Sequence, residues 1–238
     1  MSKSAKRYTR KEKKSLSLVP TPKQERRISL TPQTENQRTY ANHLNTQDLI
    51  FTIGCAGTGK TYMAATKAAM MYNDAQIKRI IITRPNIPSS RSLGAFPGTL
   101  EEKMAPWVLP VIEILRGHLG RVKVETMLKD RSIVVEPFET MRGRTFDDAF
   151  ILLDEAQNTT YDELKMFLTR LGEGSKVVVN GDVAQTDLKH TSGLRTIINI
   201  IKGQMLAYPV VEMTEEDIVR SDVCADWIRA FSKHEKRP

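Results

Sequence analysis

A glycine-rich loop carries the residues whose types and spacing most directly indicate chemistry. Residues 54–61 fit the pattern GxxxxGK[ST] in full, with Gly54, Gly59, Lys60 and Thr61 at the constrained positions. Glycines in such a loop let successive backbone N–H groups converge on an anion, because a Cβ would block the approach or forbid the required φ. The loop is therefore expected to bind phosphate.

The loop residues have distinct expected roles toward a nucleoside triphosphate and its Mg²⁺ ion. Lys60 is expected to reach the β and γ phosphates, and the Thr61 hydroxyl to hold Mg²⁺. The residues expected around the nucleotide are Gly54, Cys55, Ala56, Gly57, Thr58, Gly59, Lys60, Thr61 and Tyr62. The alternative, a plain strand-to-helix turn with a solvated lysine, is disfavoured by the apolar strand pattern before the loop and the Ala- and Met-rich helix pattern after it.

Two carboxylates follow a second apolar segment. Residues 149–153 predict a buried strand, and Asp154 and Glu155 come directly after it. In a phosphate-loop triphosphatase one such carboxylate holds Mg²⁺ and the next polarises the attacking water, so Asp154 is the metal candidate and Glu155 the catalytic one. Alone, an Asp-Glu pair is more often a helix cap or a solvated strand end. Its position downstream of the phosphate loop favours the functional interpretation.

A third strand ends in a polar turn that contains Gln185. Residues 176–180 predict the strand, and Gly181 and Asp182 predict the turn. A neutral amide at Gln185 can contact both the γ-phosphate and a water, and so report the state of the nucleotide. Without the first two motifs, Gln185 would be interpreted as an ordinary surface residue.

The elements that position these residues alternate between strand and helix. Strands are predicted over residues 49–53, 78–83, 132–136, 149–153, 176–180 and 208–213, and helices over 61–72, 101–118, 161–171, 193–201 and 215–231. Capping-box patterns pair Thr99 with Glu102, Thr160 with Glu163 and, more weakly, Thr214 with Asp217. Continuous apolar strands between amphipathic helices indicate a three-layer α/β domain with a mostly parallel sheet. Ligands bind such sheets at the carboxyl ends of the strands.

The basic character of the chain is concentrated in its first 30 residues. This segment holds ten Lys and Arg against two Glu, which accounts for the whole net charge of +8. Its composition predicts a disordered tail over residues 1–30 before a domain over 31–238. The tail serves either as a polycation that strengthens nucleic-acid binding or as a solubilising leader.

Two cysteines in 238 residues are too few for a disulfide framework and indicate a reducing compartment. The sequence has neither a signal-peptide core nor an apolar run long enough to span a membrane. A cytoplasmic protein with no membrane partner is therefore expected.

Several strings beyond the phosphate loop resemble one protein family. They are Thr31-Pro32 with Asn36-Gln37, Thr83-Arg84-Pro85, Leu93-Gly94 with Pro97-Gly98, residues 141–145, 153–160 and 165–172, and Gly181-Asp182 with Gln185. Over roughly residues 31–231 the chain resembles the PhoH proteins, which are single-domain phosphate-loop ATPases similar to the first RecA-like domain of superfamily 1 helicases. The resemblance implies a RecA-like ATPase fold.

The resemblance also implies roles for residues outside the phosphate loop. Gln37 would read adenine, the alternative being a helix-surface glutamine, and Arg84 would touch a nucleic-acid strand or pair with Glu155 or Asp154. Arg142 and Arg144 would grip strand phosphates, or one of them would enter a neighbouring subunit's ATP site, unless their loop is simply solvated. Arg220, inside the last predicted helix, is a further candidate for sensing the γ-phosphate. Trp107, between Pro106 and Pro110, is expected to pack in the core rather than to stack on a base, with a role facing a pore as the alternative.

The function expected from these features is ATP hydrolysis coupled to single-stranded nucleic acid, with an RNA helicase-like motor as the specific form. Helicases of this class complete the ATP site with a second domain, so a homo-oligomeric ring, with six subunits as the expected number, would supply the missing arginine here. The alternative is a nucleotide-dependent regulatory or scaffold oligomer that does not unwind. A small-molecule kinase is a weaker alternative, because nothing suggests an acceptor pocket.

Overall fold

The computed structural model describes residues 28–85, 100–183 and 192–235. Most of the predicted basic tail, the Thr99 cap and Gln185 lie outside these residues. Within these residues the chain forms one six-stranded sheet and the helices around it.

A single parallel sheet organises the molecule. Its six strands have the order β3-β2-β4-β5-β1-β6, and every pairing is parallel. In chain order the strands are β1 (Leu49–Gly54), β2 (Arg79–Thr83), β3 (Ile133–Val135), β4 (Ala149–Leu153), β5 (Lys176–Gly181) and β6 (Val210–Met213). All six predicted strands are therefore present, with ends shifted by at most two residues.

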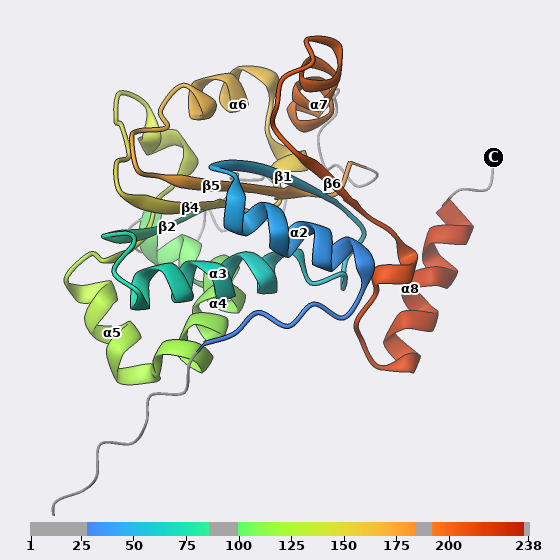
Figure 1. Cartoon of the computed structure of the whole chain (residues 1–238), viewed down its shortest axis with the longest axis horizontal. Coiled ribbons are helices and arrows are strands. Elements are labelled where there is room, and N and C mark those ends of the chain that lie inside the picture. Colours follow the sequence, from blue (N-terminus) through green and yellow to red (C-terminus); the bar gives the residue numbers. More distant parts are fainter. Residues whose placement is uncertain (1–27, 86–99, 184–191, 236–238) are drawn as a thin grey trace, which may run out of the picture.

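Helices cover both faces of this sheet (Figure 1). The α-helices are α2 (Glu35–Thr46), α3 (Lys60–Asn73), α4 (Leu100–Leu119), α5 (Arg121–Lys129), α6 (Tyr161–Leu168), α7 (Gly193–Gly203) and α8 (Asp222–Glu235). Short 3-10 turns lie at η3 (Phe138–Met141), η4 (Ala156–Asn158) and η5 (Glu215–Asp217). Helices α2 to α5 lie on one face, α6 and α7 on the other, and α8 stands at the side of the molecule (Figure 1). This is the predicted three-layer α/β architecture, consistent with a RecA-like phosphate-loop domain.

The strands are apolar on both sides because both faces are covered. Ile80, Ile82 and Phe150 pack into the core beneath α2 to α5, whereas their neighbours Ile81 and Ile151 pack toward α6 and α7. Alternate side chains of a strand point to opposite faces, so a doubly covered strand reads as a continuous apolar run. This burial fixes the register that brings the strand ends together. Among the described residues, no helix is long and apolar enough to cross a membrane.

Two helices were not predicted. Helix α2 is rich in Asn, Gln and Thr, but Tyr40, Ala41 and Leu44 repeat at helical spacing and are buried, and the Thr34 hydroxyl caps its start by accepting from Gln37 N. Helix α5 follows a break at Gly120, whose φ is 87°. Both helices pack their apolar side on the sheet side chains, so tertiary burial stabilises them where the sequence pattern is weak.

The predicted helix over residues 215–231 is wrong in its first half. Residues 215–217 form the turn η5, the chain then runs extended at Ile218, and α8 begins only at Asp222. The cause is a tertiary hydrogen bond in which Val219 N donates to Gly57 O at 3.0 Å, which draws this segment onto the phosphate loop. Of the three predicted capping boxes, those at Thr160 and Thr214 lie in the described residues, and both are confirmed. Helix α6 ends at Leu168, three residues before its predicted end.

Candidate functional site

A cavity of about 660 Å³ lies at the carboxyl ends of the central strands. Strands β1, β2, β4 and β5 are neighbours in the sheet, and the segments that follow them all contribute to its wall. Among the residues predicted for the site, the lining includes Gln37, Ala56, Gly57, Thr58, Gly59, Lys60, Thr61, Tyr62, Arg84, Asp154, Glu155 and Arg220. The volume is in the range of sites for nucleotide-sized ligands.

The phosphate loop connects the end of β1 to the start of α3. Gly57 and Gly59 have φ values of 83° and 84°, a conformation that side chains with a Cβ rarely adopt. A Cβ on Gly59 would approach the Gln37 side-chain nitrogen to 3.2 Å. This glycine therefore also leaves room for the Gln37 side chain, which hydrogen-bonds to the loop. The loop ends at the N-terminus of α3, where unpaired backbone N–H groups favour an anion.

Lys60 lies across this loop. Its Nζ donates hydrogen bonds to Gly54 O at 2.6 Å and to Cys55 O at 2.7 Å. Burial lowers the pKa of Lys60, and the nearby Asp182 carboxylate counteracts part of this effect. The Cys55 thiol is directed elsewhere, toward Thr214 O at 3.7 Å, and burial raises its pKa.

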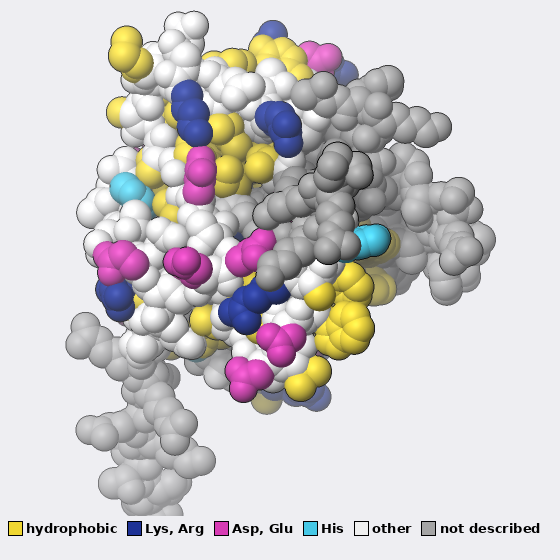
Figure 2. All heavy atoms as spheres, turned by 90° about the vertical axis from the view of Figure 1, so that its right-hand side faces the viewer, with side chains coloured by type: hydrophobic (Ala, Val, Ile, Leu, Met, Phe, Trp, Pro, Cys, Tyr) yellow, Lys and Arg dark blue, Asp and Glu magenta, His cyan; other side chains and the backbone are white. Residues whose placement is uncertain are grey.

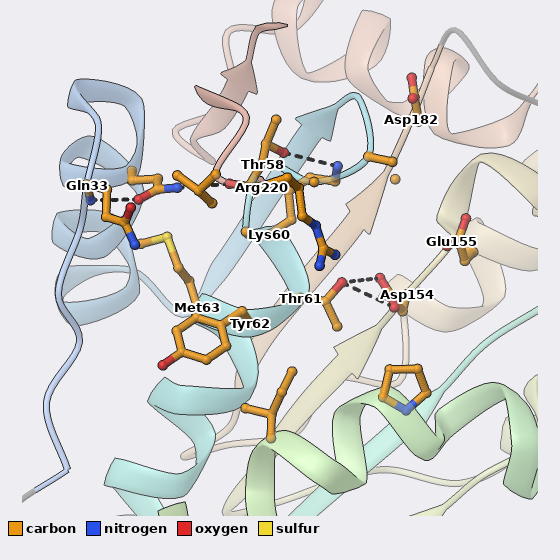
Figure 3. Close-up of a pocket in the computed structure, with 18 of the residues that line it drawn as sticks. Gln33, Thr58, Lys60, Thr61, Tyr62, Met63, Asp154, Glu155, Asp182 and Arg220 are labelled. Atoms are coloured by element: carbon orange, nitrogen blue, oxygen red, sulfur yellow. Dashed lines mark hydrogen bonds between the residues drawn. The ribbon is translucent and has the colours of Figure 1, made fainter. Parts of the chain in front are cut away.

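Thr61 and Asp154 point toward each other across the cavity (Figure 3). The Thr61 hydroxyl lies 3.1 Å from Asp154 Oδ1 and 3.3 Å from Oδ2. Burial raises the pKa of Asp154, the neighbouring Glu155 raises it further, and the Thr61 hydrogen bond opposes both. A hydroxyl and a carboxylate side by side form a hard oxygen donor pair of the kind that holds Mg²⁺, which takes few protein ligands and keeps several waters. No cluster of three or more His, Cys, Asp or Glu that could hold a metal ion occurs among the described residues.

Glu155 follows Asp154 in a left-handed backbone conformation, with φ of 57°. Its two carboxylate oxygens face different partners. Gln157 Nε2 donates to Oε2 at 2.6 Å, and Arg84 Nη2 lies 3.6 Å from Oε1. The other end of the Gln157 amide accepts a hydrogen bond from Asp182 N at 3.0 Å, which links Glu155 to the end of β5.

Arg84 extends from the end of β2 and also contacts α4. Its guanidinium lies 5.0 Å from the centre of the Trp107 ring, and Nη1 donates to Trp107 O at 3.3 Å. Of the alternatives raised for Arg84, the structure contains the pair with Glu155. The expectation for Trp107 is wrong: α4 continues through Pro106 and Pro110, and Trp107 is 39% exposed at the cavity wall.

Gln37 is buried rather than on a helix surface. Its Nε2 donates to Thr58 O at 3.1 Å, and its Oε1 accepts from Gln33 N at 2.7 Å. The side chain therefore ties the start of α2 to the phosphate loop while it lines the cavity. These bonds occupy one donor and one acceptor position of the amide and leave one N–H and one lone pair for a ligand.

Of the three other candidate arginines, Arg220 alone lines the cavity. A Cβ on Gly57 would meet Arg220 Cγ at 3.1 Å, so the arginine stem covers the loop. Arg142 and Arg144 are exposed on the turn before β4 and are not part of the cavity wall. Arg144 pairs with the buried Glu136 carboxylate and lies over the Phe146 ring, whereas Arg142 extends from the same turn as an exposed side chain.

The cavity wall also contains residues for which the sequence indicated no site role, among them Gln33, Trp107, Gln157 and Asp182. Gln157 and Asp182 carried a usable signal, because each lies within two residues of a strand end or of a candidate catalytic carboxylate. Gln33 and Trp107 come from elements whose packing against the loop is purely tertiary, so local patterns did not indicate them.

Comparisons with known proteins agree with this geometry. A family model described as PhoH-like protein matches residues 29–232. The chain is 43% identical over 207 residues to a PhoH-like protein of Bacillus subtilis, covering 86% of this chain and 65% of the relative. It is 42% identical over 210 residues to a PhoH-like protein of Mycobacterium tuberculosis (87% and 59% covered), and 40% identical over 202 residues to protein PhoH of Escherichia coli (83% and 57% covered).

These relatives are longer than the region they share with the chain. The chain spans between 57% and 65% of their length. The match extends from before α2 to within α8 and so includes every described segment of the cavity wall.

Proposed function

This chain belongs to the PhoH-like protein family, and from that premise we propose that it binds ATP with Mg²⁺ and hydrolyses it. The observation that carries the proposal is the convergence of Lys60, Thr61 and Asp154 at one end of a nucleotide-sized cavity, with Glu155 directly beside them. The family is one of phosphate-loop ATPases, and these are the side chains that phosphoryl transfer to water requires.

Each side chain has a specific task in this proposal. The loop N–H groups and Lys60 bind and orient the phosphates and stabilise charge on the transferred group. Thr61 and Asp154 would hold Mg²⁺, which when bound neutralises charge on the phosphate oxygens. Glu155 orients the attacking water and accepts its proton. Burial of Lys60 and Asp154 strengthens their electrostatic action by excluding water.

The other end of the cavity is suited to the base of the nucleotide. Gln33 and Tyr62 lie there, opposite the end that holds Glu155 (Figure 3). The unused N–H and lone pair of the Gln37 amide support adenine recognition, because adenine presents both an acceptor and a donor. The same amide braces the loop, so base recognition and loop position are coupled through one side chain.

We further propose that single-stranded nucleic acid, in particular RNA, is the macromolecular substrate. Arg84 at the cavity wall and the exposed Arg142 are the cationic side chains that support strand-phosphate contacts. Arg144 is already paired with Glu136, so its role is proposed to be support of this turn. Gln185 and Arg220 stay candidates for sensing the γ-phosphate.

A ring of identical subunits, six in number, is proposed as the working assembly. Helix α8 presents Val223, Trp227 and Phe231 at a spacing of four residues, and they are 71%, 60% and 57% exposed. Figure 2 looks at the face that carries α8 and shows hydrophobic side chains gathered on it. An apolar stripe of this kind supports a contact with another copy. The contact would bring a neighbouring arginine to the ATP site, a contribution worth roughly 10³ to 10⁵ in rate.

The direct test is ATP binding and turnover by the full chain with Mg²⁺. Lys60→Ala is expected to abolish turnover, whereas Glu155→Gln is expected to bind ATP but lose about 100-fold or more in kcat. Lys67→Ala is the matched control, since Lys67 lies on the same helix but donates to Asn45 outside the cavity. Near-normal turnover by the Glu155 variant would remove this residue from the mechanism.

Adding single-stranded RNA or DNA separates the motor from the scaffold alternative. A motor is expected to hydrolyse ATP faster with the strand and to lose strand binding as salt rises. Unchanged turnover, together with salt-independent assembly on ATP, would favour the scaffold.

A further inference from the structure

The candidate catalytic carboxylate is held from two sides in this structure. Arg84 lies 3.6 Å from Glu155 Oε1, and Gln157 donates to Oε2 at 2.6 Å. Glu155 also has a φ of 57°, a conformation that costs energy for a residue with a Cβ and persists only where its surroundings fix it. The orientation of Glu155 is therefore set by its neighbours rather than by its own backbone preference.

Arg84 is itself only partly satisfied. One side of its guanidinium lies over the Trp107 ring and Nη1 donates to Trp107 O, but Nε is buried and finds no hydrogen-bond acceptor among the described residues. A buried N–H without a partner disfavours the placement that contains it. A better acceptor near Arg84 would consequently draw it away from Glu155.

We propose that Arg84 is a positioning residue that restrains Glu155, with Trp107 as its support, so that hydrolysis is slow until an anionic strand phosphate draws the guanidinium away. A general base must direct a lone pair at the attacking water. While Arg84 and Gln157 contact its two carboxylate oxygens, Glu155 directs its lone pairs at these side chains and not at a water. A phosphate oxygen competes well for a guanidinium, because it accepts charge-assisted and often bidentate hydrogen bonds. Trp107 is exposed beside Arg84 and offers a stacking surface for a base of the same strand.

The inference rests on the proposed ATPase function and deepens it, because it assigns the means by which a strand would accelerate turnover. It makes Arg84 inhibitory in the absence of nucleic acid. A residue that only stabilised the transition state or the fold would act in the opposite direction.

The test compares Arg84→Met and Arg84→Lys in the full chain without nucleic acid. Arg84→Met keeps the stem but removes the charge, so basal kcat is expected to rise about two- to fivefold, the range for loss of a partly exposed ion pair, with KM for ATP unchanged. Single-stranded RNA should then give no further increase. Arg84→Lys retains a cation that can pair with Glu155 but loses the planar group over Trp107, so its basal rate is expected to lie between those of the wild type and Arg84→Met.

Arg116→Met is the matched control, because Arg116 on α4 also forms ion pairs, with Glu113 and Glu125, but does not line the cavity. It should change neither the basal nor the stimulated rate. An unchanged or reduced basal kcat in folded Arg84→Met overturns the inference while the proposed function stands. A wild-type protein that fails to hydrolyse ATP would instead reject the proposed function.

Trp107 provides a second route if Arg84→Met does not fold. Trp107→Ala removes the ring under Arg84 and is expected to raise basal kcat and weaken stimulation by RNA, whereas Trp107→Phe keeps a ring and should change both rates less. Equal basal rates in the Ala and Phe variants would count against the restraint.

Discussion

Two aspartates of this molecule, Asp154 and Asp217, have pKa values displaced in opposite directions. For Asp154, burial and the neighbouring Glu155 raise the pKa, and the single hydroxyl of Thr61 does not offset them. For Asp217, burial alone would raise the pKa, but hydrogen bonds from Asn36, the Thr214 backbone and Thr34 together hold it below its usual value. Asp217 thus stays ionised and ties the start of α2 to the turn η5.

Because the pKa of Asp217 is lower in the folded protein, its stabilising contribution is present above the unfolded pKa and is lost as the pH falls through the folded one. Asp217→Asn is expected to cost about 1 to 3 kcal/mol at pH 7, since the amide brings a donor against the N–H of Thr214 and the amide of Asn36. Urea unfolding from pH 7 down to about pH 3 should show the two proteins converging in stability at the acidic end.

The adjacent Glu216 provides the control for this prediction. Its side chain is exposed, so Glu216→Gln should change the free energy of unfolding by less than about 0.5 kcal/mol. If the free energies of unfolding of wild type and Asp217→Asn differ by a constant amount across the pH range, the ionised Asp217 carboxylate does not stabilise the contact between α2 and η5.

At the scale of elements, the position of the phosphate loop depends on how closely β1 and β6 approach. Gly54 ends β1 with a φ of 135°, and a Cβ there would lie 2.2 Å from Met213 O of β6. No side-chain movement can relieve a clash with a backbone oxygen. Gly54 is therefore needed for the close pairing of β1 and β6, in addition to its expected role in the phosphate loop.

Gly54→Ala is accordingly expected to lower the free energy of unfolding by about 3 kcal/mol or more, measured by thermal or urea denaturation. Gly203→Ala, at the end of α7 where a Cβ meets nothing within 4 Å, should be neutral or slightly stabilising. Similar stabilities of the two variants would show that the contact between β1 and β6 is not as tight as described.

The sequence allowed the sheet and the position of the two carboxylates after β4 to be predicted, because both depend on local patterns. β-Branched runs marked the strands, and the residues directly after them, Asp154 and Glu155, lie where parallel-sheet geometry requires. What could not be predicted depends on contacts between distant segments. Val219 N bonds to Gly57 O and replaces a helical turn near Arg220, and Trp107 faces the cavity because α4 continues through two prolines.

At the scale of the whole molecule, α8 connects the candidate site to the outer surface. Its Ile228 lies close to the phosphate loop, because a Cβ on Gly57 would meet Ile228 Cδ1 at 3.4 Å. On the exposed side of the same helix, the ring centroids of Trp227 and Phe231 lie 5.4 Å apart. Contact of another subunit with this exposed side would affect the position of the phosphate loop through α8. Assembly and turnover are therefore expected to be coupled.

Trp227→Glu tests this coupling, because it places a charge in the proposed subunit contact without touching the cavity wall. Light scattering is expected to show the wild type as a large homo-oligomer and Trp227→Glu as a smaller species, with ATP turnover reduced at least about tenfold through loss of the neighbouring arginine. Tyr208→Glu, which alters another exposed aromatic residue before β6, should retain the assembly and the rate. A monomeric wild type with brisk turnover would reject the ring.

The parallel strand order also has a consequence for how the protein is made. Strand β1 leaves the ribosome long before its partners β5 and β6, as the pairs Leu49 with Val177 and Phe51 with Val210 show. Such distant pairing is slow, since long segments must be ordered before their contacts form. The nascent chain therefore carries an unfinished phosphate-loop site until β5 and β6 have both been made, and binding of a nucleotide is expected only after that point.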